Sequence, residues 1–363
     1  MLRIIHGADF HLDSPFSGLP PEEARQRRRE NRTLPERLAQ LAARRQADLV
    51  LLAGDLFDGD EVYPETLEQL RSALAGISCP VVIAPGNHDP YCSGSPYESV
   101  DWPENVHIFR ESGLKALHFP ALGCTVYGAA FTDSFRTDEV LEGFAPGGQD
   151  GIRLLCLHGD LDRRQSKYGP LSSGQLERAG FRYAALGHVH CGTGLQRSGE
   201  TFWAYPGSVA GRGFNETGEK GVLVCTLEET GVSAELVSLG GCRYHILTAD
   251  VTGREPRSAL AEVLAPMTQR DICRVALTGE AETPPDLLGL ETEFASLCCR
   301  LQLQDETRAP VSLWEQAGED SLRGLFLRRL RQQYDAAEDG ETRRKIDLAA
   351  RFGLAALEGR DLG

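Results

Sequence analysis

Five of the nine histidines follow short apolar runs directly, and each has a carboxylate, an amide or a second histidine within a few residues. A strand that ends at a turn delivers the next side chains to the edge of its sheet, where the ligand sites of α/β folds collect. We therefore expect these groups to converge on one site. They are Asp9-Phe10-His11, Gly54-Asp55, Gly86-Asn87-His88-Asp89, His158-Gly159-Asp160 and Gly187-His188-Val189-His190.

The donors in these clusters are carboxylates, imidazoles and a side-chain amide, without a committed thiolate. This mixture favours hard first-row dications such as manganese over a structural zinc cage. There are enough donors for two ions, which can clamp a phosphoryl oxygen and activate water when one carboxylate bridges them. Asp55 is the bridging candidate because it follows the strongly apolar run 50–53. In extended chain, Asp9 and His11 point the same way, and His188 and His190 repeat their spacing.

Each cluster has an ordinary explanation when it is taken alone. A histidine after a strand is more often a hydrogen-bonded structural residue than a ligand, and Gly-Asp is common in turns. Five such clusters in one chain are hard to obtain by accident, so their combination favours a metal site. Cys156 and Cys191 lie beside these clusters in sequence, but packing is the expected role of each.

The elements that must position these residues are read from the hydrophobic pattern. From residue 1 to about 240, strand-like runs alternate with amphipathic segments, which is typical of a sheet flanked by helices. The leucine spacing predicts helices over 34–42 and 67–74. The expected strands are 2–5, 49–53, 81–84, 126–127, 154–157 and 183–186.

A different organisation begins near Gly240-Gly241. The pattern there predicts a strand over 244–251, a helix over 257–265 and a strand over 272–277, which make a small α/β appendage. The tail predicts a helical hairpin, with one helix over 322–334 and a second beyond Gly340. Its apolar face can cover the chain's own core or dock a partner, and the first interpretation is slightly favoured. The expected domains are 1–240, 241–312 and 313–363.

Composition excludes several classes of protein. Of the 363 residues, 41% are hydrophobic and 25% charged, a globular composition that leaves room for two or three domains. No apolar run approaches the roughly 20 residues of a membrane-spanning helix. The first residues lack the features of a secretory signal, so a cytoplasmic protein is expected. The ten cysteines show no C-x-x-C spacing and are expected to be reduced and mostly buried.

The net charge of −15 counts against a polyanionic partner, although a local patch can override the average. A candidate patch is formed by Arg25, Arg27, Arg28, Arg29 and Arg32. Glutamates stand among these arginines, and a solvated helix face is the favoured interpretation.

The motifs D-x-H, G-D, G-N-H-D, H-G and G-H-x-H, in this order, resemble those of the calcineurin-like metallophosphoesterase superfamily. Within it they resemble the bacterial DNA repair exonucleases of the SbcD and YhaO type. Three longer segments, 8–16, 102–109 and 205–208, resemble the YhaO branch. The resemblance covers residues 1 to about 240 well and the remainder loosely. It implies an α/β fold, a β-sandwich flanked by helices, with a small α/β capping domain and C-terminal helices.

The resemblance also implies roles for single residues. The side chain of His88 would be catalytic, stabilising charge or protonating the leaving oxygen, and Asp89 could orient its ring. Archaeal and eukaryotic relatives carry a histidine three residues after the bridging aspartate, where this chain has Asp58. One metal would be held by Asp9, His11, Asp55 and His190, and a second by Asp55, Asn87, His158 and His188.

The function that the resemblance implies is a manganese-dependent DNA exonuclease or endonuclease with two metal ions. It would act in DNA repair as a homodimer with a coiled-coil ATPase of the SbcC or YhaN kind, and the capping domain would shape the access of DNA. A metallophosphatase or cyclic-nucleotide phosphodiesterase is an alternative that suits the acidic charge better. A catalytically idle scaffold is a further one, which the complete set of ligand positions disfavours.

Overall fold

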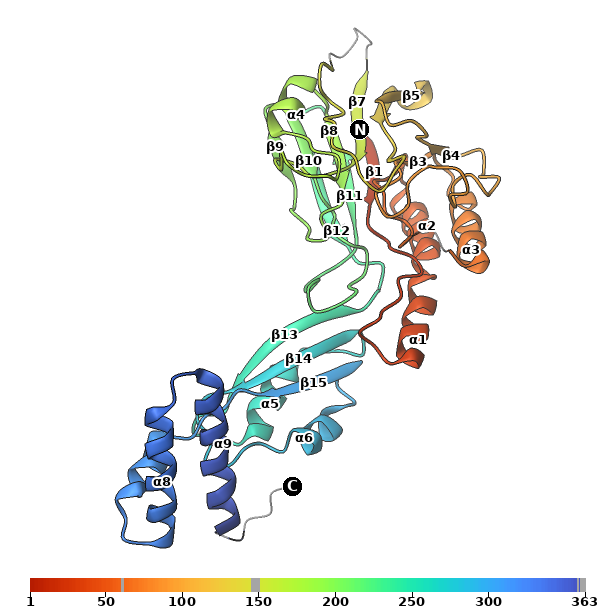
Figure 1. Cartoon of the computed structure of the whole chain (residues 1–363). Helices are drawn as coiled ribbons and strands as arrows, with labels where there is room; N and C mark the ends of the chain where they lie inside the picture. The colour runs from red at the N-terminus through yellow and green to blue at the C-terminus, as the bar shows by residue number, and fades with distance from the viewer. Residues whose placement is uncertain (60–61, 145–150, 358, 360–363) are drawn as a thin grey trace. The chain divides into compact units, whose positions relative to one another are not determined.

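The computed structural model describes residues 1–59, 62–144, 151–357 and 359. The chain divides into two compact units, Met1–Gly241 and Cys242–Gly363 (Figure 1). Each unit has its own sheets and its own hydrophobic core.

The first unit contains a six-stranded sheet in the order β12-β11-β1-β2-β3-β4. Strands β1 to β4 pair in parallel, and β11 runs antiparallel to both β1 and β12. All four residues of β2 are buried, as expected of a parallel strand that is covered on both faces. The strands are β1 (Leu2–Gly7), β2 (Leu49–Leu52), β3 (Val81–Ile83), β4 (Val106–Ile108), β11 (Val222–Leu227) and β12 (Val232–Val237).

A second six-stranded sheet has the order β5-β6-β7-β8-β10-β9. Strands β6, β7, β8 and β10 are parallel, whereas β5 and β9 close the two edges in antiparallel pairing. The strands are β5 (Lys115–Phe119), β6 (Cys124–Gly128), β7 (Ile152–His158), β8 (Tyr183–Gly187), β9 (Gln196–Ser198) and β10 (Thr201–Ala204). All six strands expected from the sequence are therefore present.

The two sheets pack face to face. One buried cluster contains Ile4 and Leu51 from the first sheet together with Val126 and Leu154 from the second. The expectation of one sheet for the strands of residues 1–240 is therefore wrong, and the sandwich implied by the family resemblance is confirmed. The hydrophobic pattern has this ambiguity because a buried strand has the same composition whichever sheet it joins.

Helices cover the outer faces of this sandwich. Leu38 of α2 and Leu70 of α3 pack on the first sheet, and Leu176 of α4 packs on the second. The two helices expected over 34–42 and 67–74 are thus confirmed as α2 and α3. The helices of this unit are α1 (Pro21–Asn31), α2 (Leu34–Arg45), α3 (Pro64–Ala75) and α4 (Ser173–Ala179), with a short 3₁₀ turn at Pro120–Leu122.

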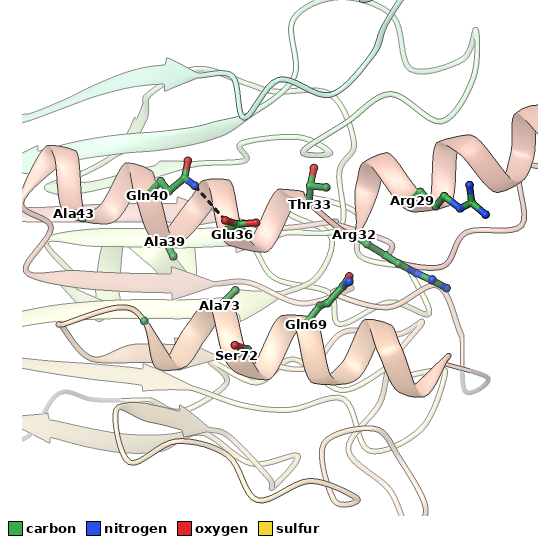
Figure 2. A pocket seen from close by; sticks show the side chains of 11 residues that line it. Arg29, Arg32, Thr33, Glu36, Ala39, Gln40, Ala43, Gln69, Ser72 and Ala73 are labelled. Atoms are coloured by element: carbon green, nitrogen blue, oxygen red, sulfur yellow. Dashed lines mark hydrogen bonds between the residues drawn. The ribbon is translucent and has the colours of Figure 1, made fainter.

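A groove with a volume of about 620 Å³ lies between α2 and α3 (Figure 2). Its lining includes the small side chains of Ala39 and Ala73, and Arg29 and Arg32 stand at one end. The arginines of the predicted patch are largely engaged within the chain. Arg27 is buried and pairs with Glu30 at 2.7 Å, and Arg32 pairs with Asp13 at 3.0 Å. These ion pairs agree with a charged helix surface rather than a site for phosphates.

The second unit begins with a parallel three-stranded sheet in the order β13-β14-β15. The expected strand, helix and strand are confirmed as β13 (Arg243–Asp250), α5 (Pro256–Leu264) and β14 (Asp271–Thr278). The sequence analysis missed α6 (Leu287–Phe294) and β15 (Arg300–Asp305). The β15 sequence RLQLQD has two leucines among polar residues, which is a weak strand signal.

The predicted helical hairpin is confirmed as α8 (Leu322–Ala336) and α9 (Gly340–Leu357), which follow α7 (Val311–Glu315) and a 3₁₀ turn at Gln316–Gly318. Leu327 of α8 packs with Ile346 and Leu354 of α9, so part of the apolar face covers the chain's own core. Leu322 and Leu325 are instead exposed.

Two further expectations concern the whole chain. None of the described helices combines the length and apolar character that crossing a bilayer demands. Within the described residues all ten cysteines are free thiols, and six of them are buried.

Candidate metal centre

The seven side chains predicted as metal ligands lie together at neighbouring strand ends of both sheets. Asp9 and His11 follow β1, and Asp55 and Asn87 follow β2 and β3 in the first sheet. His158 ends β7, and His188 and His190 follow β8 in the second sheet. Four of them, Asp9, His11, Asp55 and His158, are almost completely buried.

One group of donors consists of Asp9, His11 and His190. The Nε2 atoms of His11 and His190 face each other at 3.1 Å, and His190 Nε2 lies 3.8 Å from Asp9 Oδ1. His11 Nε2 is also 3.7 Å from Asp55 Oδ2. Imidazole nitrogens and carboxylate oxygens that converge in this way form a donor set for a cation.

A second group consists of Asp55, His158 and His188. His158 Nε2 and His188 Nδ1 each lie 3.0 Å from Asn87 Oδ1, so the amide belongs to the same group. His158 Nε2 is 3.4 Å from Asp55 Oδ2. The Oδ2 atom of Asp55 therefore stands between the two groups.

These residues fit two divalent cations. Asp55 Oδ2 is buried and has no hydrogen-bond partner among the described residues, which is costly for a carboxylate oxygen without a cation. The buried carboxylate of Asp9 adds a second negative charge. Although burial opposes it, the charge and hydrogen bond of Asp55 raise the pKa of His158 to about 9. This shift reflects an excess of negative charge at the site.

The backbone is strained where it presents these side chains. Asp9, His11, Asp55 and His188 have positive φ angles of 53°, 45°, 51° and 107°. Such angles are unfavourable for residues with a Cβ atom and collect at functional sites. Gly86 is required beside them, because a Cβ there would lie 2.1 Å from Asp55 Oδ1.

A second layer of polar residues holds the imidazoles in place. His190 Nδ1 lies 2.8 Å from Glu216 Oε1, and His11 Nδ1 lies 2.9 Å from Asp58 Oδ1. Arg212 bridges the two carboxylates, with Nε 3.1 Å from Glu216 Oε1 and Nη1 3.1 Å from Asp58 Oδ1. Outer partners of this kind fix the ring orientation and the tautomer of a ligating histidine.

The electrostatics of this layer keep both carboxylates ionised. Although burial opposes it, the hydrogen bond with His190 and the charge of Arg212 lower the pKa of Glu216 to about 2. Burial likewise opposes ionisation of Asp58, but hydrogen bonds with His11 and His88 hold its pKa well below its usual range.

The expected contact between Asp89 and the His88 ring is wrong. Both Asp89 oxygens are turned away and accept hydrogen bonds from the backbone N–H groups of residues 55, 56, 57 and 86, at 2.6 to 3.2 Å. The Tyr97 hydroxyl donates a further one at 2.6 Å. Asp89 therefore shapes the turns that carry Asp55 and Asn87.

The carboxylate beside His88 is Asp58, whose Oδ1 atom lies 3.3 Å from His88 Nδ1. The hydrogen bond to Asp58 raises the pKa of His88. The imidazole is 43% exposed and packs edge-on against the His11 ring at 4.8 Å. This places the predicted catalytic residue at the open side of the site.

The sequence analysis did not assign Asp58, Asp160, Arg212 or Glu216 to the site. Asp58 and Asp160 had a signal, because they stand within three residues of Asp55 and His158. Asp160 Oδ2 lies 3.6 Å from His188 Nε2. Arg212 and Glu216 had none, since they follow no strand and carry no recognisable spacing.

Comparison with known proteins agrees with this arrangement. The family model for the calcineurin-like phosphoesterases matches residues 2–192. The uncharacterized metallophosphoesterase YhaO of Bacillus subtilis is 30% identical over 278 residues, which cover 72% of this chain and 66% of YhaO. The SbcD subunit of the nuclease SbcCD from Staphylococcus epidermidis is 26% identical over 266 residues, 62% of this chain and 66% of the relative. The match thus spans just under two thirds of either relative.

Among solved structures, a dimetal phosphatase from Danio rerio is similar, with 14% identity and a TM-score of 0.42 over 66% of this chain and 99% of that one. The match to the family model covers more than half of the chain and includes all seven predicted ligands. The chain therefore belongs to the calcineurin-like phosphoesterase family.

Proposed function

We propose that the chain is a nuclease that depends on two divalent metal ions, most suitably manganese, and hydrolyses phosphodiester bonds in DNA. The observation that carries this proposal is Asp55 Oδ2, which is buried without a hydrogen-bond partner among the described residues and is shared by two groups of donors. The relatives that are named as part of the nuclease SbcCD support DNA as the substrate.

Each metal would have its own ligands on either side of Asp55. Asp9, His11 and His190 would complete one site, and Asn87, His158 and His188 would complete the other. Bound ions of this kind polarise phosphoryl oxygens and lower the pKa of water, so that it attacks phosphorus in line.

The protein's own contribution is to hold these groups and to manage the leaving oxygen. His88 stands partly exposed beside the buried ligands, where its ring can stabilise developing charge or donate a proton to the leaving oxygen. Asp58 contacts the Nδ1 atoms of both His88 and His11, so it can orient both rings.

We further propose that the enzyme works in DNA repair in the cytoplasm, as a homodimer with a coiled-coil ATPase of the SbcC or YhaN kind. The region 241–312 would cap the site and 313–363 would dock the ATPase. The exposed Leu322 and Leu325 on α8 support docking, because they lie outside the hydrophobic cluster of the hairpin.

The first experiment compares two substrates. Purified full-length protein with Mn²⁺ is incubated with linear DNA and with p-nitrophenyl phosphate, a small monoester. We expect cleavage of DNA, and we expect D55N to lose at least 1,000-fold in kcat. Hydrolysis of the monoester alone would contradict a nuclease. Calorimetric titration with Mn²⁺ provides a readout without turnover, in which two sites are expected in the wild type and weakened binding in D55N.

The second experiment tests the docking segment. The ATPase encoded with this protein is used to pull down the full chain and a chain lacking residues 318–363. Loss of the complex on truncation supports docking through the helical hairpin. A complex that survives the deletion contradicts it.

A metallophosphatase or cyclic-nucleotide phosphodiesterase is a second candidate, and the net charge of −15 favours it because polyanions are repelled at long range. An idle scaffold is distinguished by H88A, which would then leave the repair phenotype of cells unchanged. The nuclease proposal expects H88A to reproduce the phenotype of a deletion.

A further inference from the structure

A basic loop forms one wall of a cavity that adjoins the metal centre. The cavity has a volume of about 520 Å³ and is lined by residues 163–168 together with Asp160 and His188. Since His188 is one of the proposed ligands, a molecule held in this cavity would extend directly from the reacting phosphate.

Hydrogen bonds hold this loop in a defined conformation. The Asp160 N–H donates to the Tyr168 carbonyl at 3.0 Å, and the Ser166 hydroxyl donates to Asp160 Oδ2 at 2.5 Å. From outside the loop, the Arg136 N–H donates to the Lys167 carbonyl at 2.7 Å. The buried Asp160 thus closes the loop from within, and the segment around Arg136 braces it from without. The loop therefore presents its outward side chains from a fixed backbone.

The outward side chains are cations. Arg163 is 74% exposed and its Nε atom lies 3.9 Å from Asp160, at the limit of an ion pair. Arg164 and Lys167 are also exposed, and within the described ranges neither makes an ion pair. In a chain with a net charge of −15, three cations beside the predicted catalytic site form a local attraction for phosphate groups.

A row of rings leads outward beside these cations. The His188 ring packs against Tyr168 with centroids 5.0 Å apart, and Tyr168 packs against Phe135 at 5.8 Å. Lys167 Nζ lies over the Phe135 ring at 5.7 Å. The Phe135 side chain is 57% exposed, which is unusual for a phenylalanine, since this residue type is among those most often buried.

We propose that this loop binds a single-stranded segment of the polynucleotide next to the cleaved bond. Arg163, Arg164 and Lys167 contact its phosphates, and a base stacks on Phe135. Cations beside exposed rings are the typical platform for single strands, since duplex bases are already stacked on each other. This inference rests on the proposed nuclease function and specifies the form of its substrate.

The test measures binding without turnover. Fluorescein-labelled dT10 is titrated in EDTA with the full-length protein, and anisotropy is followed at several salt concentrations. We expect the variant R163A/R164A/K167A to bind at least tenfold more weakly, with a log–log salt slope smaller by about 2, or roughly 0.7 for each lost phosphate contact. F135A is expected to lose about fivefold or more, with an unchanged salt slope.

The matched control is R44A/R45A/R71A, which removes the same charge from the surface of α2 and α3 and is expected to bind like the wild type. Circular dichroism establishes that each variant is folded. Equal affinity of the loop variant and the control, or tighter binding of a ten-base-pair duplex than of dT10, would overturn the proposal.

Cleavage of the same oligonucleotide with Mn²⁺ separates this inference from the function on which it rests. A wild type that binds dT10 through the loop but cleaves no DNA contradicts the nuclease and leaves the binding site in place. A wild type that cleaves DNA, with a loop variant of the same KM, contradicts the binding site alone.

Discussion

At the scale of single residues, each predicted ligand histidine is positioned by a partner on its other ring nitrogen. Asp58 holds His11, Glu216 holds His190, and the Ala53 carbonyl accepts from His158 Nδ1 at 2.8 Å. These contacts leave the remaining ring nitrogen of each histidine directed into the site. The quality of the metal centre thus depends on residues that would touch neither metal.

E216Q tests this dependence. The neutral amide is a weaker acceptor for His190 and no longer balances Arg212, so Mn²⁺ affinity is expected to fall by about 10 to 100-fold. Calorimetric titration measures the change, with E235Q on β12 as the control. An unchanged affinity in E216Q would show that this contact does not support the ligand.

Metal addition should also stabilise the fold, because cations would relieve the crowding of carboxylates around Asp55 and offset the backbone strain at Asp9 and His11. We expect the melting temperature of the wild type to rise by several degrees with saturating Mn²⁺, and that of D55N to rise much less. Differential scanning fluorimetry records both. A melting temperature indifferent to Mn²⁺ would argue against the predicted site.

The seven predicted ligands could be found from sequence because short motifs place them directly after apolar runs. Asp89 shows the limit of this reasoning. It is adjacent to His88 in sequence, yet its side chain turns into the backbone of residues 55–57. Arg212 and Glu216 were out of reach, since only the folded chain brings them to His190.

At the scale of elements, single carboxylates join neighbouring strands. Asp89 connects the turn after β3 to the turn after β2, and Asp271 connects β13 to β14. Both are completely buried, so the strands they join depend on each carboxylate keeping its hydrogen-bond donors.

D89N is expected to destabilise the first unit. The amide nitrogen of asparagine cannot accept, so buried backbone N–H groups of residues 55–57 lose partners at about 1 to 3 kcal/mol each. We expect a free energy of unfolding about 2 kcal/mol lower or more, measured in urea. D101N, on an exposed carboxylate, is the control and should be neutral.

Asp271 gives the second unit a dependence on pH. Although burial opposes it, hydrogen bonds from Arg243 and Thr268 lower the pKa of Asp271 to about 2. Its ordinary value is 3.8, so the stabilisation is complete above that pH and is lost as the pH falls toward 2.

This dependence is measured by urea unfolding in a W102F/W203F background, where Trp314 reports on the second unit. D271N is expected to lower the free energy of unfolding by about 2 kcal/mol at pH 6 and by less at pH 3. An equal loss at both pH values would contradict the ionic role of Asp271.

The elements themselves were largely predictable, because apolar runs and leucine spacing report burial directly. Val50 and Val81 are in predicted strands that the structure contains. What could not be predicted is the partner of each strand. The run at 154–157 looks like the run at 49–52, yet the two belong to different sheets. Their packing partners are set by crossovers that have no local signature.

At the scale of the whole molecule, all predicted ligands and their outer partners belong to the first unit. The last residues of that unit are fastened to it, since the carbonyls of Leu239 and Gly240 accept from Arg37 Nη1 at 2.9 Å each. A chain that ends at Gly241 therefore retains its core and its donors.

We expect this 1–241 fragment to fold and to bind Mn²⁺ with the affinity of the full chain. Circular dichroism and calorimetric titration test both statements. A fragment that is unfolded, or folded without metal binding, would show that the second unit completes the predicted site. The expected division of the second unit at residue 312 stays a prediction.

The backbone passes between the two units once, at Gly241 and Cys242. A single junction means that a gene fusion or recombination event at one point could replace everything downstream while every hydrolytic group is inherited intact. Lineages could in this way acquire new clients for an old reaction, and related chains should diverge fastest after this junction.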